Sequence, residues 1–454
     1  RYPEAESAFN KAKQQSEDLE DKRGIAVAEL NLATMYNERS EFRRALETSK
    51  KALEFYTELG HAPGIVRSNM VIAASLSDLG QMNEAVLYSD RALDKAKMIG
   101  DVSLLANALG NRGVLHAEIG EFRRAASYYE NALELVEDKG MPLEIATQQM
   151  HLAGIYADLG KFDTALEYAE KAKQIYSHQG LAGSTADALH LIADLYAEWG
   201  RYEKGLEFEK QALALRRQLG LKKETAESLN NLGLLLADTG DEEGARTHLD
   251  EAMDIFLEIE YPAGISSVHN NIGVIDFEQG DYAAAARHYS KALELVQKVG
   301  DNAAIAGVME NVAGAFSAMG RYPEAVELLE KALEINKNTG EKVSVASCHS
   351  NLGANFWFLE RYKKAEDHFL RSIEIKEELR RTAEGAIRRD YLASQIWSYK
   401  GLAACRVRLG RFADAFDSVE LASARYLAEQ LRDEDAGSES PSTGTYDRPV
   451  RIGE

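Results

Sequence analysis

The sequence predicts an all-α fold, a solenoid in which antiparallel helix hairpins stack side by side. Three observations predict it: a repeat of forty residues, small and apolar residues at helical spacing inside each repeat, and glycines where helices should end. Neither helix of a hairpin could bury its apolar stripe alone. Consecutive hairpins must therefore share one continuous core.

The repeat is visible when the sequence is written in rows of forty residues, which align without gaps as far as Glu360 and resume after a short insertion. Row position 2 is usually aromatic, and row positions 5 and 12 are usually alanine. Ala5, Phe9 and Ala12 have the i, i+4, i+7 spacing of one helical face, where alanine lets a neighbouring helix approach closely. We expect one helix, helix B, in the first half of each row and another, helix A, in the second.

Glycine and proline mark the expected helix ends. Glycines recur where a left-handed residue commonly caps a helix, both after helix A, as at Gly240 and Gly280, and after helix B, as at Gly220. Pro3 and Pro323 stand at the start of helix B, where a missing N–H costs nothing. The glycine and proline positions and the periodicity of the apolar residues thus predict the same hairpins.

The Asn-Leu-Gly motif of helix A, followed by Gly, an aromatic residue and Ala, resembles the tetratricopeptide repeat signature. The usual unit has about 34 residues, and this version is longer between helix B and helix A. The resemblance covers 1–431, about ten helix pairs plus a final helix, and implies a right-handed superhelix with a concave groove for a protein or extended peptide segment. Local departures are Gly205, Glu242, Glu260 and Glu360.

Helix A should present one stripe to this groove. Row positions 29, 32, 33 and 36 carry the apolar and small residues, so positions 31 and 38 lie on the opposite side. We call positions 31 and 38 the groove stripe. Asparagine recurs at position 31, with histidine in one row: Asn31, Asn111, His151, Asn231, Asn271, Asn311 and Asn351.

Asparagine is a poor helix former, so its recurrence inside helix A requires a reason. A carboxamide both donates and accepts, which suits the backbone of an extended peptide, and similar peptide-binding repeat proteins use such a ladder. The alternative is that each asparagine bonds to the adjacent repeat and fixes its angle. Both roles can hold together.

Row position 38 is acidic in seven successive rows, at Glu38, Asp78, Glu118, Asp158, Glu198, Asp238 and Glu278. An acid in the last helical turn opposes the helix dipole at about 0.3 to 1 kcal/mol. One interpretation is a negative track that attracts a basic or N-terminal segment. The other is a solvated rim in a protein that is acidic throughout.

Composition limits the partners. The formal charge of −21 argues against nucleic acid or an anionic membrane, because both require clustered Lys and Arg. No apolar run reaches the roughly 20 residues that cross a bilayer. Two cysteines, Cys348 and Cys405, fit a reducing compartment, so we expect a cytoplasmic protein. The chain opens at Arg1 inside a motif, and an upstream segment could precede it.

No catalytic, cofactor-binding or metal-ligating motif is recognisable, and capping explains the glycines. Cys348 and His349 are sequence neighbours, so on one helix they point about 100° apart and cannot form a dyad. Among the histidines, only His151 and His190 lie near a common stripe in neighbouring rows. We predict neither an enzyme nor a metal site within this chain.

The last hairpin resembles the junction of bacterial proteins in which a tetratricopeptide array precedes a CHAT domain, a caspase-like peptidase. The resemblance rests on Glu420, Ala424-Arg425 and Leu427. Residues 432–454, rich in Asp, Glu, Ser, Gly and Pro, are predicted to be a flexible linker or tail that could lead into a following domain. The alternative is an ordinary capping helix with a frayed tail.

Two functional hypotheses follow. In the first, the array captures a protein or peptide and regulates a C-terminal CHAT-type effector in a larger signalling protein. In the second, it is a freestanding scaffold that organises a complex without any attached enzyme. The reading frame beyond Glu454 separates the two.

Overall fold

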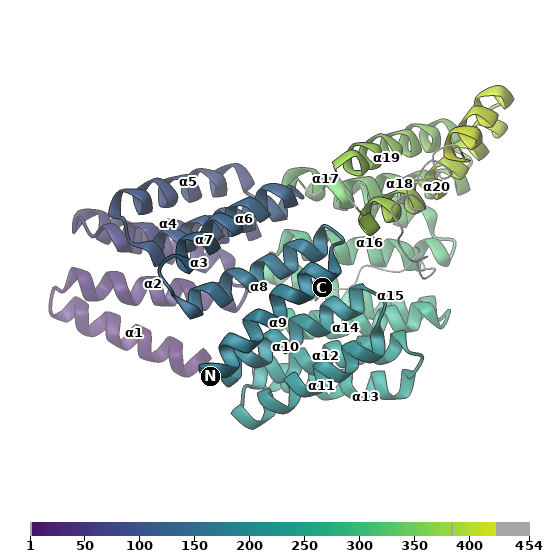
Figure 1. Ribbon diagram of the computed structural model, residues 1–454. Coiled ribbons are helices and arrows are strands. Elements are labelled where there is room, and N and C mark those ends of the chain that lie inside the picture. The colour runs from purple at the N-terminus through teal and green to yellow at the C-terminus, as the bar shows by residue number, and fades with distance from the viewer. Residues whose placement is uncertain (1, 341, 383–384, 424–454) are drawn as a thin grey trace.

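The computed structural model describes residues 2–340, 342–382 and 385–423. These residues are helical apart from short turns, without a strand among them, which confirms the predicted all-α solenoid (Figure 1). The A helices are α2 (Lys22–Glu38), α4 (Ala62–Asp78), α6 (Val102–Glu118), α8 (Pro142–Asp158), α10 (Ala182–Glu198), α12 (Lys222–Asp238), α14 (Pro262–Glu278), α16 (Asn302–Ala318), α18 (Lys342–Phe358) and α20 (Gly385–Arg408).

The B helices alternate with them. They are α1 (Tyr2–Asp18), α3 (Phe42–Glu58), α5 (Met82–Ile99), α7 (Phe122–Glu137), α9 (Phe162–His178), α11 (Tyr202–Leu219), α13 (Glu242–Glu258), α15 (Tyr282–Val299), α17 (Tyr322–Thr339) and α19 (Tyr362–Thr382). Residues 412–423 form a further helix. Each A helix packs against the B helices on both sides of it in sequence, so the hairpins stack as expected.

Alanines hold the hairpins close together. In the middle repeats, the alanines at row positions 5 and 12 of the B helices, such as Ala285 and Ala292, have no exposed surface. The short side chain of alanine lets the crossing helices approach closely. Larger residues, such as Phe256 and Tyr289, fill the space between successive crossings and are also fully enclosed.

The glycine of the Asn-Leu-Gly motif has a packing reason. A Cβ on Gly273 would lie 2.7 Å from the Tyr289 ring, and one on Gly113 would lie 2.8 Å from the Tyr129 ring. Alanine stands at this row position opposite small residues, as in the pair Ala33 and Ser49, but also opposite Leu329, at Ala313. The glycine is thus needed where the facing residue of the next B helix is aromatic, as at Tyr129 and Tyr289.

Left-handed residues end the helices, as predicted. The glycines at row positions 20 and 40 have positive φ, for example 67° at Gly220 and 82° at Gly280. Where glycine is missing, Glu260 and Glu360 still adopt φ of 53° and 59°. The hairpin geometry thus imposes this conformation on residues that disfavour it.

Replacing Glu260 by glycine is expected to raise the free energy of unfolding by about 0.5–1 kcal/mol, because it removes the Cβ clash of the left-handed conformation while making the unfolded chain more flexible. Urea denaturation followed by circular dichroism measures the change. Gly280→Ala is the matched control and should destabilise the array, since it introduces a Cβ at φ 82°. A lower midpoint for the Glu260 variant would contradict the argument.

The superhelix is wound tightly enough for distant repeats to touch. Asn302 Nδ2 donates to the Leu79 carbonyl oxygen at 2.7 Å, although 223 residues separate them. Lys223 Nζ likewise donates to the Glu38 carbonyl oxygen at 3.4 Å. We call the contact between the ends of α4 and α6 and the α16–α17 hairpin the seam, where the purple-blue repeats meet the green ones (Figure 1).

Two predictions fall on residues outside the described ranges: the end of the solenoid at 431 and the linker at 432–454. Most of the CHAT-like junction, at Ala424-Arg425 and Leu427, lies there too. Within the described residues, none of the helices has the length and apolarity needed to span a bilayer.

Candidate functional site

The groove stripe is accessible in part of the array. On α2, Asn31 and Glu38 are both exposed, and on α8, His151 and Asp158 are both exposed. Glu198 on α10 and Glu278 on α14 are exposed as well. The helices α2, α8, α10 and α14 therefore offer polar or acidic surface at the predicted positions.

His151 and Asp158 lie seven residues apart on one face of α8, open to solvent but surrounded by protein. His151 stacks on Tyr129 with ring centroids 4.8 Å apart, and desolvation lowers the pKa of this imidazole. Desolvation also raises the pKa of the Asp158 carboxyl to about 6. Accessible groups with such shifts are expected on a concave wall, where surrounding protein displaces bulk water without sealing the site.

The asparagines at row position 31, which we call the asparagine ladder, point into the spaces between hairpins in several repeats. Asn111 Nδ2 donates to the Met70 carbonyl oxygen at 3.4 Å, Asn271 Nδ2 to Asn230 Oδ1 at 3.0 Å, and Asn311 Nδ2 to Asn270 Oδ1 at 2.8 Å. Each bond spans 41 residues and joins an A helix to the A helix of the preceding repeat. Asn231 donates to Asp194 and Glu209.

Two asparagines of row position 31 are too deeply buried to fit the peptide-binding prediction. Asn271 is 0% exposed and Asn311 is 4% exposed, so neither carboxamide can reach a ligand in this conformation. Their contacts fit the alternative role of fixing the angle between repeats. Both residues therefore leave the candidate peptide-binding set, because inter-repeat bonds occupy the amides. Asn111, Asn231 and Asn351 are half-buried and remain candidates.

The acidic residues of the stripe also divide. Asp78 and Glu118 are half-buried at the seam, where Asp301 approaches them from the start of α16. Burial, together with the charges of Glu118 and Asp301, raises the pKa of Asp78 to about 7. Burial also raises the pKa of Glu118, which accepts from Ser77 Oγ, and that of Asp301. Asp238 is half-buried too. The acid track is continuous in sequence but not in accessibility.

Asp78→Asn is expected to stabilise the array at pH 8 by about 1–2 kcal/mol, because it removes a carboxylate that burial and two like charges disfavour. A raised folded-state pKa means that the Asp78 contribution is most favourable below about pH 4 and is lost as pH rises through about 7. The gain should therefore shrink as pH falls from 8 to 4. Thermal unfolding at several pH values measures it, and a gain independent of pH would contradict this account.

A partly buried ionic network joins the fifth and sixth hairpins. His190 Nδ1 lies 2.7 Å from Glu209 Oε2, and its Nε2 lies 3.7 Å from Asp194 Oδ2. Although burial favours the neutral ring, the two carboxylates raise the pKa of His190 to about 9. The ligand-type atoms of these three residues all lie within 4.8 Å of one another. Because each ring nitrogen faces a different carboxylate, the arrangement is that of an ion-paired imidazolium.

Sequence reasoning missed this network and others built on row position 30. That position is apolar in early rows, at Leu30, Met70 and Met150, and then becomes polar at His190, Asn230, Asn270 and Glu310. This change from apolar to polar residues is the sequence signal that could have revealed the networks. Glu310 accepts from Asn336 Nδ2 at 3.2 Å, and burial raises the pKa of its carboxyl to about 7.

Both cysteines lie in the interior of the array. Cys348 and Cys405 are fully buried, and burial raises the pKa of both thiols, that of Cys405 to about 12. His349 turns to His368, with the two Nδ1 atoms 2.9 Å apart. A thiol with a raised pKa is a poor nucleophile. The arrangement around Cys348 offers no activated thiolate.

Solved structures share this fold. A Rap protein complexed with competence and sporulation factor is 19% identical, with a TM-score of 0.52, and the match covers 78% of this chain and 98% of that one. NprR from B. thuringiensis is 15% identical, with a TM-score of 0.49 and coverage of 79% and 98%. A STAND protein with a tetratricopeptide repeat sensor from Pyrococcus horikoshii is 17% identical, with a TM-score of 0.49 and coverage of 81% and 54%.

No curated protein matches the sequence. The family model for the tetratricopeptide repeat matches residues 65–138, 144–218, 224–298, 264–338 and 303–378. These segments cover more than half of the chain, and each spans A and B helices of consecutive hairpins. The chain therefore belongs to the tetratricopeptide repeat family.

Proposed function

We propose that the array binds an extended, basic protein segment at the exposed part of the groove stripe in its N-terminal half. The observation that carries this proposal is the exposed pair of His151 and Asp158 on α8, which lies on the same stripe as the exposed Asn31 and Glu38 on α2. These side chains combine negative charge with groups that can bond to a peptide backbone.

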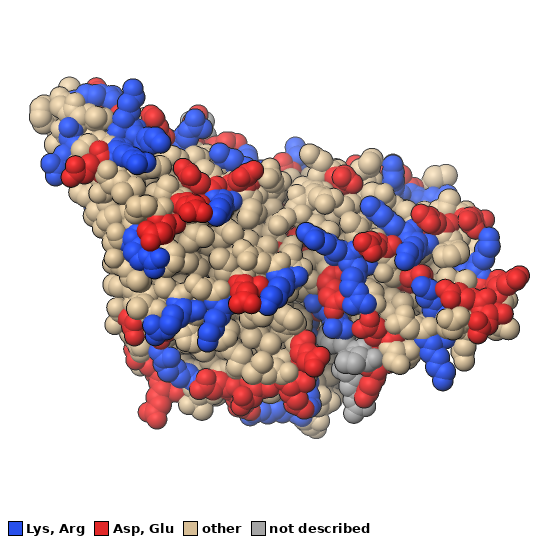
Figure 2. Space-filling model, turned by 180° about the vertical axis from the view of Figure 1, so that it is seen from behind, with Lys and Arg blue, Asp and Glu red and all other residues tan. Residues whose placement is uncertain are grey.

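The chemistry of Asp158 favours a cation. Surrounding protein raises the pKa of this carboxyl to about 6, so its ionised form lacks part of the stabilisation that water would provide. A lysine or arginine of a ligand would restore that stabilisation. Both signs of charge are interspersed over the face in Figure 2, so that face does not present one uniform field.

The comparison with the Rap protein is compatible with this proposal, since that protein was solved with competence and sporulation factor. Its likeness to this chain concerns the fold. The choice of ligand therefore rests on the stripe itself, where the exposed positions are acidic or can form hydrogen bonds.

Two fluorescein-labelled peptide pools test the proposal, one rich in Lys and Arg and one rich in Asp and Glu, with anisotropy as the readout. The basic pool should bind, and its binding should weaken with added salt. A variant carrying both His151→Ala and Asp158→Asn should bind about tenfold more weakly, because a charge-assisted hydrogen bond contributes about 1.5–3 kcal/mol. Binding should strengthen as pH rises from 5 to 7.5, since Asp158 ionises near pH 6.

Glu134→Gln provides the matched control. Glu134 is exposed on α7, a B helix, and its substitution removes a negative charge away from the groove stripe. Binding to this variant should equal that of the wild type. Equal affinity for both pools, or equal losses in the α8 variant and the Glu134 variant, would refute the proposal.

We propose further that the array is the sensing or regulatory part of a larger signalling protein with a C-terminal CHAT-type effector. We expect a further structural element to pack against the last described helix, because Phe412 and Phe416 are each 67% exposed and Val419 is 50% exposed. Earlier B helices cover this side with the next hairpin. A reading frame that continues past Glu454 into a peptidase would support the proposal, and a stop codon there would favour the freestanding scaffold.

A further inference from the structure

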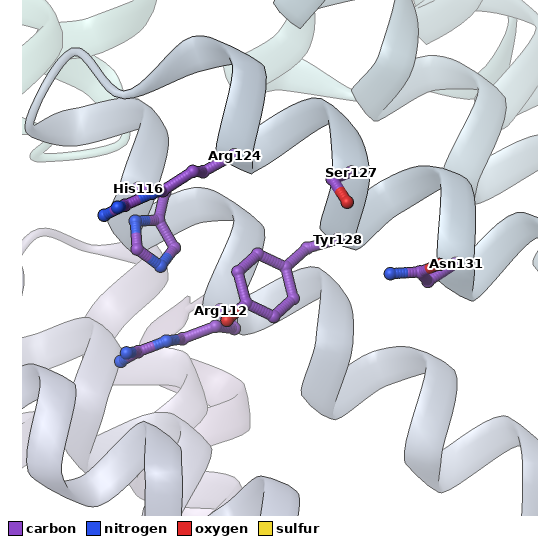
Figure 3. A pocket seen from close by; sticks show the side chains of 6 residues that line it. All are labelled: Arg112, His116, Arg124, Ser127, Tyr128 and Asn131. Atoms are coloured by element: carbon purple, nitrogen blue, oxygen red, sulfur yellow. The ribbon is translucent and has the colours of Figure 1, made fainter.

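A pocket of about 480 Å³ opens between the third and fourth repeats, away from the groove stripe. Arg112 and His116 of α6 and Arg124, Ser127, Tyr128 and Asn131 of α7 line it (Figure 3). Although the protein is strongly acidic, this lining contains two arginines and no carboxylate. The residues that line the pocket are therefore basic or neutral, with Asp90 and Glu121 as ion-pair partners outside the lining.

Arg112 is the unusual residue of the pocket. It occupies row position 32, where other repeats carry buried residues such as Leu32, Leu152 and Leu232. The side chain is 13% exposed and reaches the adjacent helix α5, where Nη1 donates to the Val86 carbonyl oxygen and Nη2 faces Asp90 Oδ1, both at 3.4 Å. A guanidinium therefore replaces a core aliphatic side chain.

The guanidinium of Arg112 is poorly satisfied by the described protein. Its Nε is buried without a hydrogen-bond partner, and both contacts of its terminal nitrogens are long. A guanidinium offers five N–H donors in a planar fork, and leaving a buried donor unpaired costs about 1–3 kcal/mol. This deficit points to a ligand that supplies acceptor oxygens.

Arg124 of α7 and His116 of α6 add further donors to the pocket. Arg124 is 69% exposed, and its Nη1 bonds to Glu121 Oε2 at 2.8 Å, which also lies 2.8 Å from His116 Nδ1. His116 stacks on Tyr128, with ring centroids 5.1 Å apart, so the imidazole edge is held in place. Glu121 and Asp90 are the nearby acids, and neither lines the pocket.

We infer that this pocket binds the oxyanion group of a small ligand, a phosphate monoester or a carboxylate, with Arg112 as the principal contact. Arg112 would meet two oxygens with its fork, Arg124 would approach from the rim, and Ser127 and Asn131 would bond to the rest of the ligand. This site is independent of the groove and of any peptide bound there.

Isothermal titration with inorganic phosphate and with succinate tests the inference and distinguishes the two ligand sources. Wild-type protein should bind at least one of these anions, and Arg112→Leu should weaken that binding by about tenfold or more, since it removes a bidentate charged partner. The variant should stay folded, because leucine stands at this row position in other repeats. Circular dichroism checks this.

Arg43→Ala is the matched control, since Arg43 is an exposed arginine on α3 and does not line the pocket. Its affinity for the anion should equal that of the wild type. Arg124→Ala should show an intermediate loss. The inference is overturned if wild-type protein binds neither anion, or if folded Arg112→Leu protein binds the anion as tightly as wild type.

Discussion

Replacing Tyr289 by alanine is expected to lower the free energy of unfolding by about 3–5 kcal/mol, the range for a large aromatic side chain removed from a close-packed core. Tyr289 is 0% exposed and lies over Gly273, within the core shared by the seventh to tenth hairpins. Urea denaturation followed by circular dichroism measures the loss. Because stability in a solenoid is largely a sum over neighbouring repeats, it should appear as early unfolding of the hairpins around α15.

The partner of this prediction is Gly273→Ala, which should cost about 1–3 kcal/mol, because the new Cβ would lie 2.7 Å from the Tyr289 ring. Combining it with Tyr289→Ser recreates the Ala33 and Ser49 pair of the first repeats. The double variant should therefore be more stable than the sum of the single losses predicts. Strictly additive losses would contradict a direct contact between the two positions.

Glu209→Ala should destabilise the array by about 3 kcal/mol, the lower end of the cost of breaking a buried ion pair. Glu209 is 0% exposed, accepts from Asn231 and pairs with His190. Asp194 remains close to the imidazole and limits the loss. Urea denaturation gives the free energy, and NMR titration of His190 should show its pKa falling from about 9.

Glu209→Leu separates the loss of charge from the loss of volume. Leucine occupies the same row position at Leu249 and Leu329, where it is buried. This variant should be more stable than Glu209→Ala, because it fills the cavity, while still lowering the pKa of His190. If the two variants had equal stability and an unchanged His190 pKa, the network would not have the role assigned to it.

The fold was predictable because the same pattern of small, aromatic and glycine residues recurs in row after row. One hairpin is defined by an aromatic residue at row position 2, alanine at positions 5 and 12, and glycine at each helix end. The next row repeats this pattern. A single substitution such as Glu260 cannot obscure a pattern with so many copies. Its backbone follows the glycine conformation of the other rows.

The candidate site was less predictable. Helical periodicity indicates which side of a helix a residue faces, but not how deeply that residue is buried. Asn31 and Asn271 share row position 31, yet one is exposed and the other fully buried. Asn31 lies on α2, the first A helix of the described residues, whereas Asn271 lies against the A helix of the preceding repeat. Where row position 30 of that preceding helix is asparagine, as at Asn230 and Asn270, its Oδ1 accepts from the asparagine at position 31 of the next repeat.

The seam could not be predicted from the repeat at all. Each hairpin is rotated slightly relative to the previous one, and small rotations add up over several repeats. Only the sum decides whether α16 reaches α4 and places Asp301 beside Asp78. Arg112 is different, because an arginine in a leucine position is visible in the sequence, although its purpose is not.

Photo-crosslinking tests most directly whether the concave side of the array receives a ligand. Benzoylphenylalanine placed at position 151, on the exposed stripe of α8, should crosslink a labelled lysine-rich peptide, and an excess of unlabelled peptide should suppress the product. The same amino acid at position 134, exposed on α7, should yield little product. Equal crosslinking at both positions, or product at position 134 alone, would contradict binding in the groove.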